Sequence, residues 1–204
     1  REGHPVTVVA VTKTHPAAAA RAALAAGLVD LAENRVQDLE QKVRELEGHD
    51  VTWHLIGHLQ RNKVRKALPL FDLLHSLDSL RLAREISRVA REEGVTVRAL
   101  VQVNTSGEEA KGGFELVEAV DAVGAITELP GLSIEGMMTM APFDAGEPIL
   151  RATFGAAREL SETVARQVPA FRPIHLSMGM SGDYEVAVEE GSTIVRLGTV
   201  LYGA

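Results

Sequence analysis

The stretch VTVVAVT, residues 6–12, decides the fold class of this chain. It is rich in β-branched residues and almost wholly apolar, without the alternation of polar and apolar residues that a half-exposed strand shows. Such a run is typical of a strand that is buried on both faces, as in parallel sheets. We therefore predict a parallel sheet whose two faces are both covered by helices.

Helical patterns follow this strand and recur along the chain. Pro16 suits the first turn of a helix, and Gly27 stands where a helix ends in a left-handed residue. The next segment has apolar residues spaced by three and four, which form one stripe: Val36, Leu39, Val43 and Leu46. The charged residues between them, Lys42 included, are expected to face water. The same pattern recurs near residues 82–90, 116–123 and 150–164.

Eight predicted strands alternate with these helical segments. They cover residues 6–12, 28–32, 51–56, 71–76, 97–104, 132–138, 173–177 and 193–197. No Pro- or Gly-rich linker divides the chain, so we predict one α/β domain over residues 1–204, a (β/α)8 (TIM) barrel. An open, doubly wound α/β sheet is the alternative, because periodicity does not show whether a sheet closes.

The composition argues against several classes of protein, namely nucleic-acid-binding, membrane and disulfide-bonded proteins. The 204 residues include 21 Lys and Arg against 28 Asp and Glu, which gives a net charge of −7, and no cysteine. No block of five like charges occurs, so neither nucleic acid nor a charged membrane surface is an expected partner. The aliphatic runs are far shorter than the roughly 20 residues of a membrane span. Disulfides are excluded, and we expect a cytoplasmic protein.

Lys13 follows the first predicted strand directly, and functional residues of α/β barrels gather at the C-terminal ends of the strands. Its strand neighbours are Val, Ala and Thr, so its amine is expected in a low dielectric, which favours the nucleophilic free amine. Such lysines form Schiff bases with carbonyl compounds. A lysine that merely extends to solvent or pairs with a carboxylate fits the sequence equally well.

Two small-residue turns follow the last two predicted strands. Residues 177–182 read SMGMSG and open a helix over residues 183–190, and Gly198-Thr199 follows the final strand. Hydroxyls and bare amides at a helix start bind phosphate, and barrels often hold phosphate between these two loops. We predict a phosphorylated ligand here. The alternative is that the glycines only make tight turns.

Arg196 and two histidines complete the candidates. Arg196 alternates with Val195 and Leu197, so it either points into the barrel mouth or forms a structural ion pair. His54 and His58 lie on a strand and a loop without a nearby carboxylate, so we expect no metal site. Gln60, Asn62 and Lys63 could orient a ligand or form a solvated first helical turn.

These residues belong to long motifs that together resemble one family. The motifs are AVTKT at 10–14, AENRVQ at 32–37, WHLIGHLQRNK at 53–63, QVN at 102–104 with Lys111-Gly112-Gly113, GMM at 136–138, SMGMS at 177–181 and GST with VRLG between residues 191 and 198. They resemble the pyridoxal phosphate homeostasis proteins, the YggS/PROSC family, over the whole chain.

The resemblance implies a barrel similar to the N-terminal domain of alanine racemase and a pyridoxal 5′-phosphate (PLP) cofactor. Lys13 would carry PLP as a Schiff base, and Arg196 would face its pyridine nitrogen. Ser181, Gly198 and Thr199 would bind the phosphate. Asn34, His54 and Met178 would line the site.

The function that this resemblance implies is a protein that carries or buffers PLP, in vitamin B6 and amino-acid homeostasis, without fast turnover. The expected partners are PLP and PLP-dependent apoenzymes, and the expected state is a monomer. The main alternative is a PLP-dependent amino-acid racemase, which needs a second domain with a catalytic tyrosine, whereas this sequence ends six residues after Gly198. A sugar-phosphate isomerase or aldolase would fit the phosphate turns but would be colourless.

Overall fold

The computed structural model describes residues 4–108 and 112–203, so Lys111 of the quoted motifs lies outside the described residues. The strands of the barrel are β1 (Thr7–Val11), β2 (Asp30–Glu33), β3 (Thr52–Leu55), β4 (Leu73–Leu77), β5 (Val97–Asn104), β7 (Leu132–Met138), β8 (His175–Met180) and β9 (Ile194–Leu197). They pair in parallel in the order β4-β3-β2-β1-β9-β8-β7-β5, and the pairing of β4 with β5 closes the ring. The predicted barrel is confirmed, and the open sheet is ruled out.

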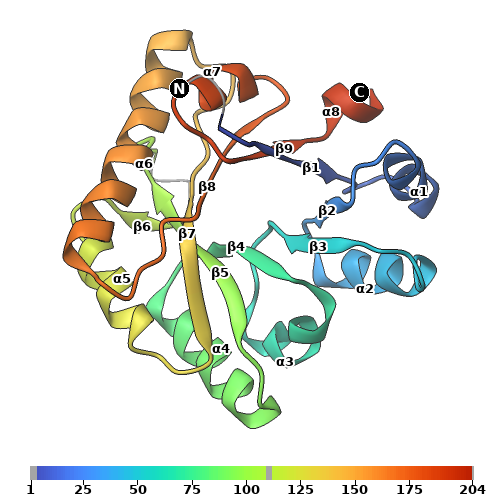
Figure 1. Cartoon of the computed structure of the whole chain (residues 1–204), viewed down its shortest axis with the longest axis horizontal. Coiled ribbons are helices and arrows are strands. Elements are labelled where there is room, and N and C mark those ends of the chain that lie inside the picture. The colour runs from blue at the N-terminus through green and yellow to red at the C-terminus, as the bar shows by residue number, and fades with distance from the viewer. Residues whose placement is uncertain (1–3, 109–111, 204) are drawn as a thin grey trace.

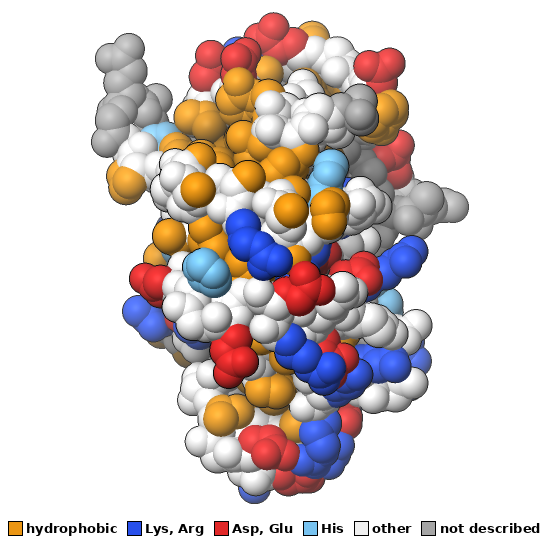
Figure 2. Space-filling view, turned by 90° about the vertical axis from the view of Figure 1, so that its right-hand side faces the viewer, with side chains coloured by type: hydrophobic (Ala, Val, Ile, Leu, Met, Phe, Trp, Pro, Cys, Tyr) orange, Lys and Arg blue, Asp and Glu red, His pale blue; other side chains and the backbone are white. Residues whose placement is uncertain are grey.

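Helices cover the outside of the strands, as Figure 1 shows. They are α1 (Ala17–Ala25), α2 (Val36–Glu45), α3 (Val64–Ala67), α4 (Leu80–Glu93), α5 (Ala119–Thr127), α6 (Glu147–Gln167), α7 (Tyr184–Glu189) and α8 (Thr199–Tyr202), with 3₁₀ turns at Arg61–Lys63 and Leu68–Leu70. On the face in Figure 2, lysine and arginine side chains are interspersed with acidic ones. None of the helices in the described part of the chain is long and apolar enough to cross a membrane.

Two elements differ most from the sequence prediction, while the bounds of β1, β2, β3, β4 and β9 move by one or two residues. The short strand β6 (Phe114–Glu115) pairs with the end of β5, and α5 therefore begins only at Ala119, which leaves Leu116 exposed. Strand β8 runs to Met180, three residues beyond the predicted end. A register shift against β9 admits one extra residue of β8, and Gly179 there has a φ of +94°. Such a bulge is invisible to hydrophobic patterns.

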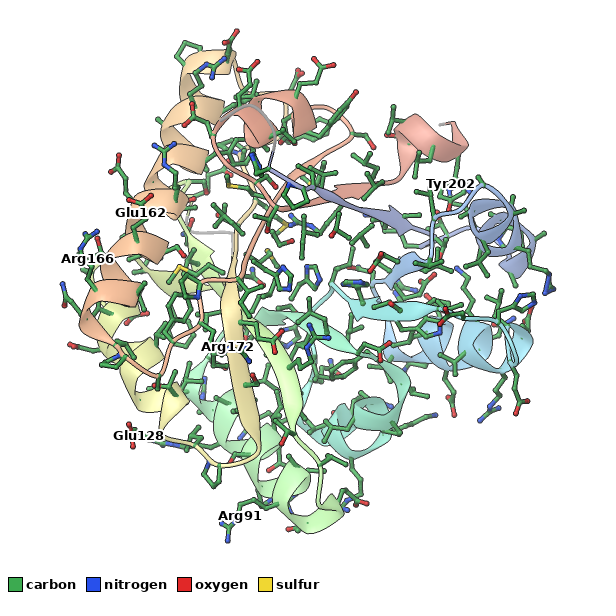
Figure 3. The ribbon with its side chains drawn as sticks, in the orientation of Figure 1. Arg91, Glu128, Glu162, Arg166, Arg172 and Tyr202 are labelled. Atoms are coloured by element: carbon green, nitrogen blue, oxygen red, sulfur yellow. The ribbon has the colours of Figure 1, made fainter. Side chains whose placement is uncertain are left out.

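The core has two parts. The larger cluster lies between the strands and the helices, and Leu31, Leu74 and Phe154 are among its fully buried members. The smaller cluster fills the barrel interior with apolar side chains from six strands: Val9, Val11, Ala32, Leu73, Leu100, Met138 and Ile194. The interior therefore holds a packed layer of side chains, which Figure 3 shows as sticks between the strands.

The prediction that Lys42 faces water is wrong. Its side chain is buried on the inner face of α2, where it forms an ion pair with the fully buried Glu33 at the end of β2. Position 42 follows Leu39 by three residues and precedes Leu46 by four, so it belongs to the apolar stripe itself. The partner that makes a buried lysine tolerable comes from a strand, which the helical pattern does not reveal.

Candidate functional site

Lys13 lies in a tight turn at the C-terminal end of β1. The N–H of His15 donates to the carbonyl of Thr12 at 3.0 Å, and Thr14 has a φ of +66°. A β-branched residue in the left-handed region is a genuine outlier, of the kind that occurs at functional sites. Lys13 itself is exposed at the rim, contrary to the expectation that apolar neighbours would surround its amine. Lys13 lies in the turn beyond the end of β1, so the apolar residues of the strand do not surround its amine.

A buried polar cluster anchors this turn from behind. The Lys42 ammonium donates to the carbonyl of Thr12 at 2.6 Å and to the carboxylate of Glu33. The Thr12 hydroxyl also donates to Glu33, at 2.5 Å. The peptide bond that leads into Lys13 is therefore held by a charged group that loop motion cannot displace easily, because charge-assisted bonds are strong when buried.

The loops after β8 and β9 meet at Ser181. Its hydroxyl oxygen accepts the N–H of Gly198 at 3.1 Å and the N–H of Val200 at 3.3 Å. Thr199 lies between them and is exposed. The structure thus brings together the three predicted phosphate residues and adds the amide of Val200, which the sequence interpretation missed. Both amides are engaged by the Ser181 oxygen in this structure, so an anionic group would bind here by sharing or replacing that acceptor, next to the hydroxyls of Ser181 and Thr199.

Arg196 points into the barrel and is only 4% exposed. Its guanidinium donates to the Ser177 hydroxyl at 2.7 Å and to the carbonyl of Thr139 at 3.0 Å. Thr139 directly follows the last residue of β7, so the guanidinium lies at the same end of the barrel as Lys13. Burial lowers the pKa of Arg196 to about 10, which leaves it charged at neutral pH.

Arg196 forms no ion pair among the described residues, so the structural ion pair considered for it is absent there. A buried charge without a carboxylate partner is costly. A guanidinium offers five donors, and the two bonds given above use one hydrogen on each terminal nitrogen. Its charge and remaining donors are therefore suited to a ligand acceptor at the mouth.

His54 lies in the barrel interior rather than at the rim. One ring nitrogen is 2.8 Å from His75 and the other is 3.0 Å from the carboxylate of Asp30. His75 in turn lies 2.9 Å from the hydroxyl of Ser177. Both nitrogens of His54 therefore have protein partners, and its connection to the mouth runs through His75, Ser177 and Arg196.

Asn34 lines a hollow of about 590 Å³ on the rim. The backbone of Gly57 approaches it so closely that an added Cβ would lie 2.1 Å from the Asn34 carbonyl oxygen. His58, Gln60 and Lys63 line the same hollow, and His58 bonds to Asp78 at 2.8 Å. No cluster of metal ligands occurs among the described residues.

Met178 lies away from the mouth, whereas Tyr202 packs beside the Lys13 turn. The Met178 side chain packs in the outer core, on the face of β8 opposite Ser177, so the structure does not bring it to the mouth. Tyr202, labelled on α8 in Figure 3, has its ring 4.9 Å from that of His15. Burial and the nearby charge of Glu33 raise the pKa of Tyr202, so the phenol stays protonated at neutral pH.

Comparisons with known proteins agree with this geometry. The family described as alanine racemase, N-terminal domain, matches residues 1–204. A pyridoxal phosphate homeostasis protein of Aquifex aeolicus is 40% identical over 96% of this chain and 86% of its own length. PipY of Synechococcus elongatus, solved with PLP bound, is 40% identical, with a TM-score of 0.92 over 99% of this chain and 95% of its own.

Alanine racemase itself shares the fold. The enzyme of Clostridium difficile superposes with a TM-score of 0.83 over 99% of this chain but only 53% of its own, at 17% identity. At that identity the likeness concerns the fold alone. The close relatives, by contrast, match in sequence across nearly the entire chain. The chain therefore belongs to the family of pyridoxal phosphate homeostasis proteins, on the fold of the alanine racemase N-terminal domain.

Proposed function

We propose that this chain binds PLP at the mouth of its barrel and carries or buffers it, in vitamin B6 and amino-acid homeostasis. The observation that supports this best is the buried Arg196, which forms no ion pair among the described residues and lies at the same barrel end as Lys13 and Ser181. A primary amine, the hydroxyls and amides around Ser181 and a buried donor match the aldehyde, the phosphate and the ring nitrogen of PLP. The residues present therefore fit the cofactor.

Each residue has a distinct proposed role. When bound, PLP supplies an aldehyde that reacts with primary amines and a ring that withdraws electrons. The Lys13 amine would hold the aldehyde carbon covalently, with release of water. Ser181, Thr199 and the amides of Gly198 and Val200 would hold the phosphate. Asn34 would contact the ligand from the rim.

Arg196 also bears on turnover. A guanidinium can only donate a hydrogen bond, so it would leave the pyridine nitrogen without a proton. That arrangement weakens the electron-withdrawing power on which most PLP enzymes depend. A racemase compensates with a second base opposite its lysine. Tyr202 is a poor base here, because its pKa is raised. We therefore propose that the protein holds PLP without fast turnover.

The cellular setting follows from the same proposal. We propose that residues 1–204 act as one PLP-binding domain, in the cytoplasm and as a monomer, and that PLP-dependent apoenzymes accept the cofactor from it. The homeostasis names of the close relatives support this role.

The direct test is chemical labelling. The purified protein, loaded with PLP, should be yellow and should lose its visible absorbance on borohydride reduction, with the label on the peptide that contains Lys13. Lys13→Ala should fold but stay colourless, whereas Lys66→Ala, at another exposed lysine, should remain yellow. Label on another peptide would overturn the assignment.

Turnover is tested separately. Incubation of the loaded protein with L-alanine should give no D-alanine or keto acid at a rate near 1 per second, the lower end for typical enzymes. A rate at or above that value would favour the racemase alternative.

A further inference from the structure

A continuous row of polar side chains crosses the interior of the barrel. It begins at Asp30, the first residue of β2, and ends at Arg196, whose guanidinium reaches the mouth. Between them the successive distances are 3.0 Å from Asp30 to His54, 2.8 Å to His75, 2.9 Å to Ser177 and 2.7 Å to Arg196. Apolar side chains such as Val9, Leu73 and Leu100 pack in the same interior, and His175, Arg98 and Glu135 lie near the Asp30 end of the row. Such a row is costly to bury unless each group has its partner.

The donor at Arg196 leaves the Ser177 hydrogen available to this row. Arginine can only donate, so the Ser177 oxygen accepts from it, and the single Ser177 hydrogen can go to Nδ1 of His75. In that arrangement Nδ1 of His75 accepts and the ring hydrogen of His75 is on Nε2. Burial, followed by the charges of His54 and Arg196, holds the pKa of His75 well below its ordinary value, in agreement with a single ring hydrogen.

The carboxylate at the other end selects this arrangement. The Nε2 hydrogen of His75 points at Nδ1 of His54, so His54 also carries its hydrogen on Nε2, which faces the Asp30 carboxylate. If both rings had the opposite tautomer, the bare Nε2 of His54 would lie 3.0 Å from a carboxylate oxygen. Two acceptors at that distance repel. With one hydrogen on each ring, the Asp30 carboxylate therefore permits one orientation of every hydrogen between it and Arg196.

We propose that Asp30, His54, His75 and Ser177 are positioning residues for Arg196, joined in one directional hydrogen-bond chain with both rings as Nε2–H tautomers. The chain holds the guanidinium through a neutral hydroxyl. The Asp183 carboxylate acts on Arg196 only through its charge and forms no ion pair with it among the described residues, so the guanidinium donors that point to the mouth stay available for a ligand acceptor. The identity of that acceptor, the pyridine nitrogen of PLP, rests on the proposed function.

The tautomers can be measured without the cofactor. In ¹⁵N-labelled PLP-free protein at pH 7.5, two-bond ¹⁵N–¹H spectra distinguish a ring nitrogen that carries hydrogen from one that does not. We expect both His54 and His75 to show a protonated Nε2 and a bare Nδ1. A hydrogen on Nδ1 of either ring, as would arise if His54 carried two hydrogens and donated toward His75, would overturn the proposed direction.

The effect on Arg196 is tested with a matched pair of serines. Ser177→Ala removes the link to Arg196, whereas Ser192→Ala removes an equally buried hydroxyl that bonds only to backbone carbonyls, among them Met178 at 2.7 Å. We expect Ser177→Ala to raise the dissociation constant of PLP about tenfold or more, from the loss of a bond that orients a charged donor. Ser192→Ala should keep the dissociation constant within about threefold of the wild-type value, because the Ser192 hydroxyl has no hydrogen bond to Arg196 or to the row.

The outcomes separate the two proposals. If wild-type protein fails to bind PLP, the proposed function fails, and the tautomer spectra still decide whether the chain exists. If PLP binds but Ser177→Ala and Ser192→Ala behave alike, Ser177 does not position Arg196 and the inference fails. Ser177→Thr, which keeps the hydroxyl, should recover most of the affinity lost in Ser177→Ala.

Discussion

Replacement of Lys42 by methionine should destabilise this protein strongly, although Lys42 lies on a helix of otherwise ordinary sequence. Methionine fills nearly the same volume as the lysine stem but removes the ammonium. Glu33, whose side chain is fully buried, would then keep only the Thr12 hydroxyl as a donor. One of its carboxylate oxygens already lacks a hydrogen-bond partner among the described residues.

The size of the effect follows from this imbalance. Removal of one partner from a buried ion pair costs about 3–5 kcal/mol, because the other charge remains buried without compensation. The Thr12 carbonyl keeps the His15 N–H, so it adds little to the loss. For a protein of this length, about 3–5 kcal/mol corresponds to a fall in the melting temperature of about 6–20 °C.

Urea denaturation of PLP-free protein measures the change, with Lys66→Met as the control. Lys66 pairs with Glu40 at 2.6 Å on the surface, and this hydrogen bond lowers the pKa of Glu40. Water screens the surface pair, so its loss should have a far smaller effect. Adding Glu33→Gln to Lys42→Met removes the stranded charge and should recover much of the stability. Equal, small effects of Lys42→Met and Lys66→Met would refute the reasoning.

Three further outcomes are expected. Ser181→Ala should weaken PLP affinity roughly tenfold, since hydrogen bonds to a charged group contribute about 1.5–3 kcal/mol, and unchanged retention through dialysis would contradict the phosphate site at Ser181. Gly57→Ala should destabilise the chain by about 1–3 kcal/mol in urea, because its Cβ would collide with the Asn34 carbonyl; a stability equal to wild type would show that the loop yields. The free energy of unfolding should fall as the pH decreases below about 6.5 toward 5, by about 1.4 kcal/mol per unit for His75, because the unfolded chain then binds a proton that the buried ring does not. His75→Gln should flatten that slope, and an unchanged slope would exclude His75 as its source.

The sequence predicted the barrel well, because its strands are locally encoded. The bounds of β5 and β7 coincide with the predicted ones, since both segments are rich in aliphatic residues and Met and are followed directly by threonine, at Thr105 and Thr139. The closure of β4 onto β5 could only be inferred from the strand count. The end of β8 was misplaced because a bulge at Gly179 interrupts the pairing without any change in hydrophobicity.

The candidate site was predicted unevenly. Lys13, Ser181 and Arg196 stand at strand ends, and such positions can be read from the order of strands alone. His54 was placed at the site by resemblance, whereas its two ring nitrogens bond within the barrel interior. Met178 faces the outer core because β8 alternates, and its neighbour Ser177 takes the inward position.

The sequence by itself determined the alternation of strands and helices, the parallel sheet and the group of reactive residues at one end of it. These features depend on periodicity and chain order, which are local properties. Only the tertiary structure decided that Lys42 is buried against Glu33, that the Ser181 hydroxyl meets the amides of another loop, and that Asp30 connects to Arg196 through three side chains. The paired residues are 9 to 102 positions apart in the chain, so no local pattern could reveal which buried polar group compensates which.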